Sequence, residues 1–159
     1  MNLTCNLRQG LPSDLTEIQQ LFVRSINTAC VHDYDAAQRR VWSSSIKNKE
    51  RWNDILCNQY LIVAEVDNIV VGFASSDKDY LDTLFVHNEY QRTGIAKKLF
   101  DAIEKRMNDE GREMLNVQAS KTALPFFEAM GCTIVNEQTL NIKGVPISNY
   151  GITKVLTAI

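Results

Sequence analysis

A short apolar run, a glycine-containing loop and an amphipathic helix follow one another in this chain, and together they constrain its fold most. Residues 80–86 are rich in strand formers, as a buried strand requires. A helical stripe comes next, with apolar residues four positions apart at Ile95, Leu99, Ile103 and Met107. The sequence therefore predicts a strand–loop–helix unit over residues 80–107.

The loop at residues 91–96 has the chemistry of an anion site. Gly94 stands where the loop becomes the helix, and a residue without Cβ can adopt a positive φ and let a ligand approach the backbone. The first N–H groups of a helix lack intrahelical partners, and the helix dipole adds partial positive charge there. Arg92, Lys97 and Lys98 add formal positive charge. We expect this unit to hold a phosphate or pyrophosphate.

Two familiar glycine-rich signatures do not fit the loop. A dinucleotide fingerprint needs G-x-G-x-x-G, and a P-loop needs Gly-Lys-Ser/Thr; both are absent. The pattern that fits is Q/R-x-x-G-x-G/A, with Gln91, Gly94 and Ala96 in its fixed places. This motif resembles the acetyl-CoA-binding motif of the GCN5-related N-acetyltransferases, the GNAT superfamily.

A second stretch, residues 120–132, resembles the GNAT segment A-x-x-F-Y-x-x-x-G-F. Ala123, Phe126 and Gly131 are in register with it. Phe127 departs from it, because many family members carry there a tyrosine that protonates the leaving thiolate. Cys132 replaces the usual phenylalanine, and we expect it to be a small buried hydrophobic residue.

Further residues resemble a bacterial subgroup of small GNATs with poorly defined substrates. They are the His-x-Tyr near residue 32, Trp42, and the Asn149-Tyr150 pair. Trp42 and Trp52 are expected to cover the core from the helical side, and Trp42 is also a candidate for the wall of an acceptor pocket.

The resemblance covers essentially the whole length and implies one α/β domain over residues 1–159. The expected fold is a mixed, mostly antiparallel, twisted sheet of about seven strands flanked by helices. Strands 80–86 and 114–119 are expected to be parallel central neighbours. The remaining predicted strands are 3–7, 60–66, 69–74, 133–140 and 147–156, and helices are predicted near 15–26, 35–42, 49–56 and 95–107.

The activity that the resemblance implies is transfer of an acetyl group from acetyl-CoA to a primary amine, most simply of a small molecule, by direct attack in a ternary complex. A protein or peptide N-acetyltransferase and a catalytically silent CoA-binding sensor remain alternatives, the latter because of Phe127. An interrupted ladder between the two central strands would leave backbone groups of Phe85 and Val86 free for the pantetheine and the thioester carbonyl. The full set of expected cofactor contacts is Leu84, Phe85, Val86, Gln91, Arg92, Thr93, Gly94, Ile95, Ala96, Lys97, Ser120, Phe126 and Phe127.

Two catalytic residues are predicted, Asp82 and Tyr150. An alkylamine has a pKa of roughly 10, so a carboxylate or an ordered water is wanted to take its proton. Alternate strand residues share a face, which predicts that Asp82 points with Leu84 and Val86. Asp82 as a solvated strand-end residue is the alternative. Tyr150 is the candidate replacement for the missing tyrosine, and a half-buried strand tyrosine is its alternative.

Composition excludes several other classes. A net charge of −2 argues against nucleic acid, which selects basic surfaces. The sequence shows neither an apolar run of ~20 residues nor signal-peptide order, so no membrane partner is expected and the expected location is cytoplasmic. The four cysteines are scattered and His32 lacks ligand spacing, so no metal or disulfide is predicted. Monomer and homodimer both stay open. Asp33, Asp35, Asp77 and Asp79 would suit a cationic amine if they faced the cleft.

Overall fold

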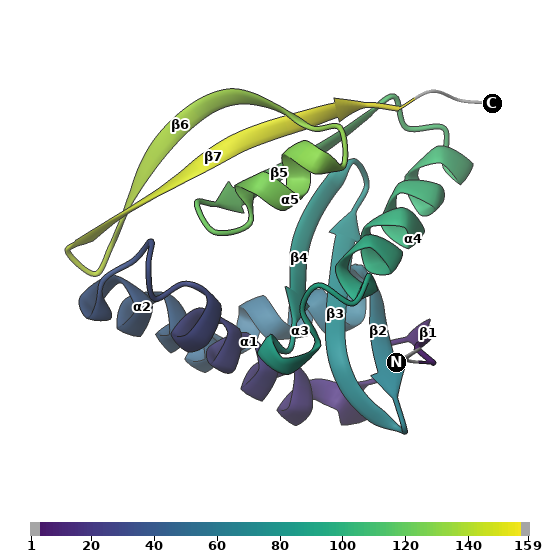
Figure 1. Ribbon diagram of the computed structural model, residues 1–159, viewed down its shortest axis with the longest axis horizontal. Coiled ribbons are helices and arrows are strands. Elements are labelled where there is room, and N and C mark those ends of the chain that lie inside the picture. The colour runs from purple at the N-terminus through teal and green to yellow at the C-terminus, as the bar shows by residue number, and fades with distance from the viewer. Residues whose placement is uncertain (1–3, 157–159) are drawn as a thin grey trace.

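The computed structural model describes residues 4–156 and places a seven-stranded sheet at their centre (Figure 1). The strand order is β1-β2-β3-β4-β5-β7-β6. Only β4 and β5 pair in parallel, so the prediction of a mixed, mostly antiparallel sheet with two parallel central neighbours is confirmed. The strands are β1 Asn6–Gln9, β2 Tyr60–Val66, β3 Ile69–Asp77, β4 Tyr80–Val86, β5 Met114–Ser120, β6 Thr133–Ile142 and β7 Val145–Val155.

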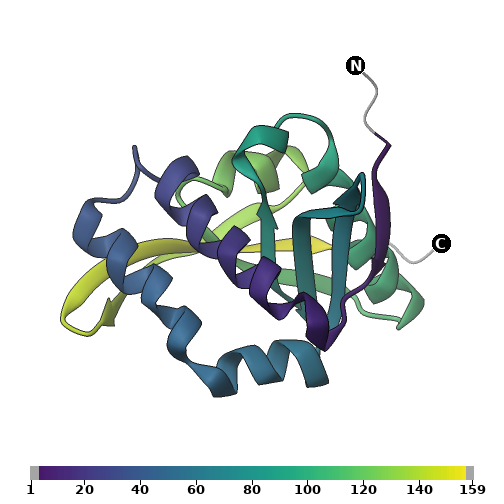
Figure 2. The same cartoon turned by 90° about the horizontal axis from the view of Figure 1, so that it is seen from below.

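Helices cover both faces of the sheet (Figures 1 and 2). One face carries α4, whose predicted apolar stripe is buried among residues of β2 to β5 and β7. The other face of β2 and β3 carries α1 and α3. The helices are α1 Leu15–Ala29, α2 Ala36–Ser43, α3 Lys49–Asn58, α4 Ile95–Asp109 and α5 Leu124–Ala129. Within residues 4–156, none of these has both the length and the apolar character needed to cross a bilayer.

Local sequence chemistry accounts for most element ends. Asp67 and Asn68 form the turn between β2 and β3, and both adopt positive φ values, 52° and 64°. Asp35 caps α2, since its side chain accepts a hydrogen bond from the backbone N–H of Gln38 at 2.8 Å. These short-range signals place the hairpin and the helices correctly along the chain.

The first strand lies further along the chain than the sequence predicts. The alternation predicts a strand over residues 3–7, whereas β1 covers Asn6–Gln9; Leu3 lies outside the described residues. The strand forms where it pairs with β2, with Asn6 opposite Glu65 and Gln9 opposite Ile62. Pairing with a distant strand, and not the local alternation, therefore sets its position.

Asp14 stands at the N-cap position of α1, but its side chain makes no capping hydrogen bond to that helix. It accepts two hydrogen bonds from Arg8, both at 2.8 Å, and one from the backbone N–H of Leu11. The hydrogen bonds from Arg8 lower the pKa of Asp14 more than its burial raises it. A lowered folded-state pKa stabilises the fold above the unfolded value of about 4, and this contribution is lost as pH falls through the folded-state pKa.

We therefore expect Asp14→Asn to lower the free energy of unfolding at neutral pH by about 1–2 kcal/mol and to flatten its dependence on pH under acid. Urea titrations at a series of pH values measure both effects. Asp109→Asn, which removes an exposed ion pair with Lys105, is the control and should change stability by less than about 0.5 kcal/mol. Wild-type and Asp14→Asn curves that stay parallel through the acid range would contradict the assignment.

Candidate active site

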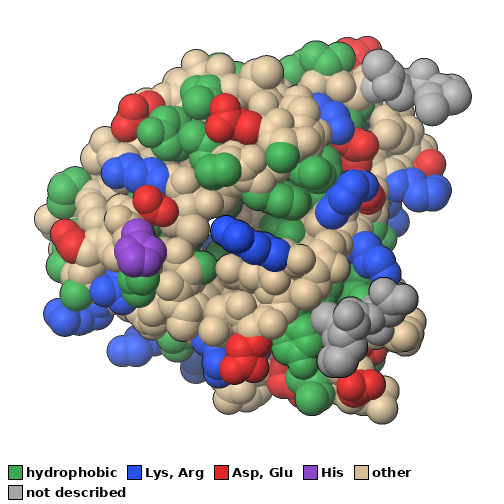
Figure 3. Space-filling model, viewed as in Figure 1, with side chains coloured by type: hydrophobic (Ala, Val, Ile, Leu, Met, Phe, Trp, Pro, Cys, Tyr) green, Lys and Arg blue, Asp and Glu red, His purple; other side chains and the backbone are tan. Residues whose placement is uncertain are grey.

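The two parallel strands separate toward one end, and the separation opens a cavity. Ladder pairing between β4 and β5 is confined to Tyr80 with Asn116 and Leu81 with Val117. Beyond that point, Leu84, Phe85 and Val86 line a cavity of about 920 Å³. Figure 3 shows a hollow near the centre of the face that it displays, crossed by a Lys or Arg side chain and bordered by hydrophobic ones. The interrupted ladder predicted from the sequence is confirmed.

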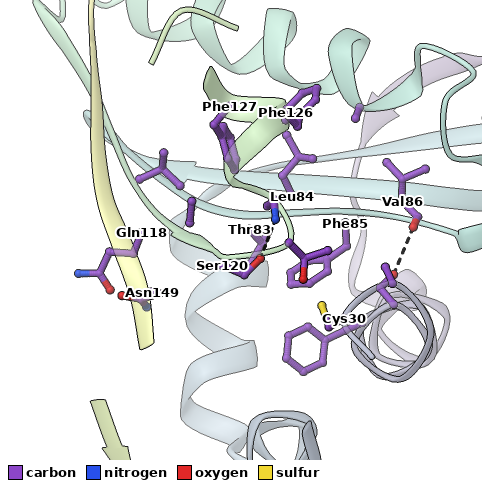
Figure 4. Close-up of a pocket in the computed structure, with 18 of the residues that line it drawn as sticks. Cys30, Thr83, Leu84, Phe85, Val86, Gln118, Ser120, Phe126, Phe127 and Asn149 are labelled. Atoms are coloured by element: carbon purple, nitrogen blue, oxygen red, sulfur yellow. Dashed lines mark hydrogen bonds between the residues drawn. The ribbon is translucent and has the colours of Figure 1, made fainter. Parts of the chain in front are cut away.

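The end of β4 is held by side chains from two other segments (Figure 4). The Val86 carbonyl accepts from the Ser25 hydroxyl at 3.2 Å and from the Gln91 side-chain amide at 3.4 Å. The backbone N–H of His87 bonds to Val71 of β3 at 2.7 Å. The strand end is therefore fixed on its β3 and α1 sides, while the side toward β5 faces the cavity.

The start of α4 has the geometry of an anion site. Gly94 is left-handed at φ 87°, and a Cβ there would meet nothing within 4 Å, so the backbone conformation and not the lack of space requires glycine. The first hydrogen bond of α4 runs from the Lys98 N–H to the Gly94 carbonyl. The N–H groups of residues 95–97 precede it and have no partner within the helix. Gly94, Ala96, Lys97, Gln91 and Arg92 all line the cavity.

The segment around α5 forms the wall opposite the end of β4. The Ser120 hydroxyl accepts from the Ala123 N–H at 3.1 Å, and Ser120, Phe126 and Phe127 line the cavity (Figure 4). Phe127 is only 3% exposed and packs edge to face on Phe100 of α4. Its ring supplies no hydroxyl, so this position cannot donate a proton.

Cys132, next to this segment, is 4% exposed within the main core, as predicted. Burial raises the pKa of its thiol, with the Lys154 charge opposing, so it stays protonated and apolar at neutral pH.

The far end of the cavity is built from α1, α2, α3, β4 and the β6–β7 hairpin. Its ion pair joins Asp82 to Arg51, whose two terminal nitrogens bond to the two carboxylate oxygens, the second at 2.8 Å. The side-chain amide of Gln59 donates to the same carboxylate at 2.6 Å. The Asp82 side chain is 7% exposed and that of Arg51 40%. Asp82 is thus buried and held by donors from α3 and from Gln59.

The predicted face of Asp82 is wrong. The register between β3 and β4 shifts so that Ser75 lies opposite Thr83 and Ser76 opposite Leu81, which leaves Asp82 as an unmatched residue of a bulge. Leu84 and Val86 pack on the α4 side, whereas the Asp82 carboxylate reaches α3. A bulge breaks the alternation of side chains, so the period of two cannot be extended across it.

The structure brings most of the sequence-predicted site residues to this one cavity. Of the cofactor set, Thr93 and Ile95 do not line it: the Thr93 hydroxyl bonds to the Tyr90 carbonyl, and Ile95 is 2% exposed in the core. Tyr150 does not line it either, and packs against the main core while its neighbour Asn149 does line the cavity. A proton-donating role for Tyr150 stays a prediction.

The four acidic loop residues are not part of the cavity lining. Asp35 caps α2, Asp33 accepts from the Thr122 hydroxyl at 2.8 Å, and Asp79 receives a long contact from Asn116. Neither these three nor Asp77 lines the cavity. They do not supply a site for a cationic acceptor there.

Sequence reasoning misses Arg51, Gln59 and the contacts of Tyr34. The Tyr34 hydroxyl donates to the Ser148 carbonyl at 2.8 Å and accepts from the Lys121 N–H at 2.9 Å, so it joins the α1–α2 loop to β7 and to the segment before α5. The family resemblance includes Tyr34 but does not indicate these partners. No local signal marks Arg51 or Gln59, since their partner Asp82 lies 23 or more residues away.

Comparison with known proteins agrees with this architecture. The model of the acetyltransferase (GNAT) domain family matches residues 30–154. The uncharacterized N-acetyltransferase YafP of Escherichia coli K12 is 31% identical over 144 residues, which is 91% of each chain. A GCN5-related N-acetyltransferase from Rhodopseudomonas palustris superposes with a TM-score of 0.93 at 32% identity, covering 98% of this chain and 99% of that one. The PaiA N-acetyltransferase of Thermoplasma acidophilum, solved in complex with coenzyme A, superposes at 0.75 with 17% identity, covering 96% and 99%.

The split sheet and the N-terminus of α4 together form a cavity with an anion site at one end, as a nucleotide-bearing ligand requires. The chain belongs to the GNAT acetyltransferase family, and it is an N-acetyltransferase. The resemblance seen in the residues 91–96 motif and in the segment 120–132 is thereby confirmed, as is the GNAT fold.

Proposed function

We propose that this protein transfers the acetyl group of acetyl-CoA to a primary amine of a small molecule, by direct attack in a ternary complex. The observation that carries the proposal is the separation of β4 from β5. It joins the anion site at Gly94 and the apolar far end into one cavity of about 920 Å³. A thioester held at one end and an amine held at the other can therefore meet beside Phe85 and Val86.

The first half of the proposal is the placement of CoA. The pyrophosphate would lie on the free N–H groups at the start of α4, where Arg92 and Lys97 supply positive charge. The pantetheine would extend along Leu84, Phe85 and Val86, and the thiol would come close to Ser120 and Phe126. The complex of PaiA with coenzyme A supports a CoA-binding role for this fold.

A small acceptor is favoured because the far end of the cavity is closed by contacts between distant segments. The Gln38 side-chain amide of α2 donates to the Pro146 carbonyl of β7 at 2.9 Å. Tyr34 donates to the Ser148 carbonyl, and Lys143 at the hairpin turn lies 3.5 Å from the Ser44 hydroxyl. Figures 1 and 2 show the tip of the β6–β7 hairpin beside α2. A peptide running through this end would have to break these contacts.

The second candidate, a silent CoA sensor, rests on Phe127. CoA binding alone should stabilise the protein by about 2.7 kcal/mol at a hundred-fold excess over Kd, and NAD should give no shift. Release of free CoA thiol from acetyl-CoA in the presence of a panel of primary amines then separates the two functions. Amine-dependent thiol release supports the enzyme. A CoA-induced shift without amine-dependent release supports the sensor, and no shift with CoA contradicts both.

A further inference from the structure

The far end of the cavity is walled mainly by aromatic and aliphatic side chains. Phe22 packs edge to face on Trp52, with ring centroids 5.3 Å apart, and on Phe85 at 5.1 Å. Trp42 packs in the same manner on Tyr34 at 5.5 Å. Phe22 and Trp52 are 6% and 3% exposed. These two groups of packed rings form an apolar wall, and such a wall favours a ligand with an apolar, flat body.

Among residues 4–156, no side chain that lines this end offers a free negative charge. Asp82 is the only acidic side chain among the described residues that line the cavity. Its two carboxylate oxygens already accept hydrogen bonds from Arg51 and Gln59. An ammonium ion entering here would lose its hydration and find no counter-ion, which is costly. Beside this ion pair, the cavity is lined by the neutral amides of Gln118 and Asn149, and Asn149 Oδ1 has no hydrogen-bond partner in the part of the chain that the structure describes (Figure 4).

The remaining titratable groups at this end are not bases at neutral pH. Burial raises the pKa of the Tyr80 phenol, and the Asp82 charge adds to the rise while Arg51 opposes it. Burial likewise raises the pKa of Cys30 and of Tyr34. All three side chains therefore stay protonated, and none of them is set to remove a proton from an alkylammonium ion.

An acceptor that is already neutral avoids both difficulties. An alkylamine, with a pKa of roughly 10, arrives as a cation. An aromatic amine delocalises its lone pair into the ring, is a far weaker base, and is uncharged at neutral pH. Building on the proposed acetyl transfer, we propose that the acceptor is a neutral primary amine carried directly on an aromatic ring, seated among Phe22, Trp42, Trp52 and Phe85.

The reaction balances without a resident base. The amine nitrogen attacks the thioester carbonyl carbon, the C–N bond forms and the C–S bond breaks. The nitrogen gives up one proton and the CoA sulfur gains one, which yields an anilide and free CoA. The nitrogen of the addition intermediate is a strong acid, so water is a sufficient proton acceptor.

A pair of isomeric amines tests the inference. In p-toluidine the nitrogen is on the ring, and in benzylamine it is one carbon away; the two have the same atoms and nearly the same size. At neutral pH, with the uncatalysed rate subtracted, we expect kcat/KM for p-toluidine to exceed that for benzylamine by about tenfold or more. Spermidine should be a still poorer acceptor.

A charge-changing variant gives the inference a second readout. Gln118→Glu places a carboxylate in the cavity and should shift the ratio of the two kcat/KM values toward benzylamine by about tenfold. Gln20→Glu makes the same change on the exposed face of α1, outside this cavity, and should leave the ratio unchanged. The CoA-induced thermal shift of each variant checks that the fold and the cofactor site are intact.

The outcomes separate this inference from the function on which it rests. Transfer to benzylamine or spermidine at a rate equal to or above that to p-toluidine overturns the aromatic acceptor and leaves acetyl transfer standing. A ratio that does not move in Gln118→Glu, with the CoA shift intact, also overturns it. No transfer to any amine overturns the proposed enzyme function and this inference with it.

Discussion

Gly94→Val is expected to abolish most of the thermal stabilisation that CoA gives to the wild-type protein. Gly94 holds φ 87° at the start of α4, a conformation that a β-branched residue adopts only with strain. A Cβ at this position would meet nothing within 4 Å, so the variant is not blocked by a clash in the free protein. The loss should come from redirecting the N–H groups of residues 95–97 and from placing a side chain where the pyrophosphate would approach.

Gly111→Val is the matched control for backbone strain. Gly111 has φ 75°, again with nothing within 4 Å, and it follows the far end of α4 without lining the cavity. Both variants should lower the melting temperature without ligand by a similar amount, and only Gly94→Val should lose the shift with CoA. A CoA shift of wild-type size in Gly94→Val would remove residues 91–96 from the cofactor site.

The sequence predicts the fold well where local signals decide the structure. Strand formers at 80–86 and the i, i+4 stripe from Ile95 to Met107 specify a buried strand and a one-faced helix whatever surrounds them. The left-handed conformation of Gly94 could be predicted because glycine is the residue that most readily adopts a positive φ at a loop–helix junction. Most of the cofactor side of the cavity lies in this continuous segment, so its residues could be named in advance.

The acceptor side could not be predicted in the same way. It is assembled from α1, α2, α3, β4 and the β6–β7 hairpin, which meet only in the folded chain. A bulge opposite Ser75 and Ser76 turns Asp82 toward α3. The alternation of side chains along a strand does not indicate where such a bulge will occur. The pairing of Asp82 with Arg51, 31 residues earlier, is a tertiary contact and so is invisible to local patterns.

Asp82→Asn is expected to destabilise the protein by about 2 kcal/mol and to change kcat/KM by a factor that is the same at every pH. In this interpretation Asp82 is a positioning residue that holds Arg51 against the cavity wall, because Arg51 and Gln59 already bond to both of its oxygens. Removing one partner of an ion pair in which Asp82 is 7% exposed leaves a guanidinium without its counter-charge. Accepting a proton from substrate would likewise cost Asp82 its pairing with Arg51.

The sequence-based prediction of Asp82 as the general base gives a different result, and the pH–rate profile separates the two. A base should show a loss of roughly 10²–10⁴ in kcat/KM with an alkylamine, shrinking as pH rises because more of the amine is then neutral. A positioning residue should show parallel profiles, and Arg51→Met combined with Asp82→Asn should recover most of the lost melting temperature, since no charge is then left unpaired. Asp54→Asn, at a half-buried carboxylate that accepts hydrogen bonds from Asn58 and Gln59, is the control for a change of charge on α3. Profiles that converge at high pH, together with a double variant no more stable than Asp82→Asn, would return Asp82 to the role of base.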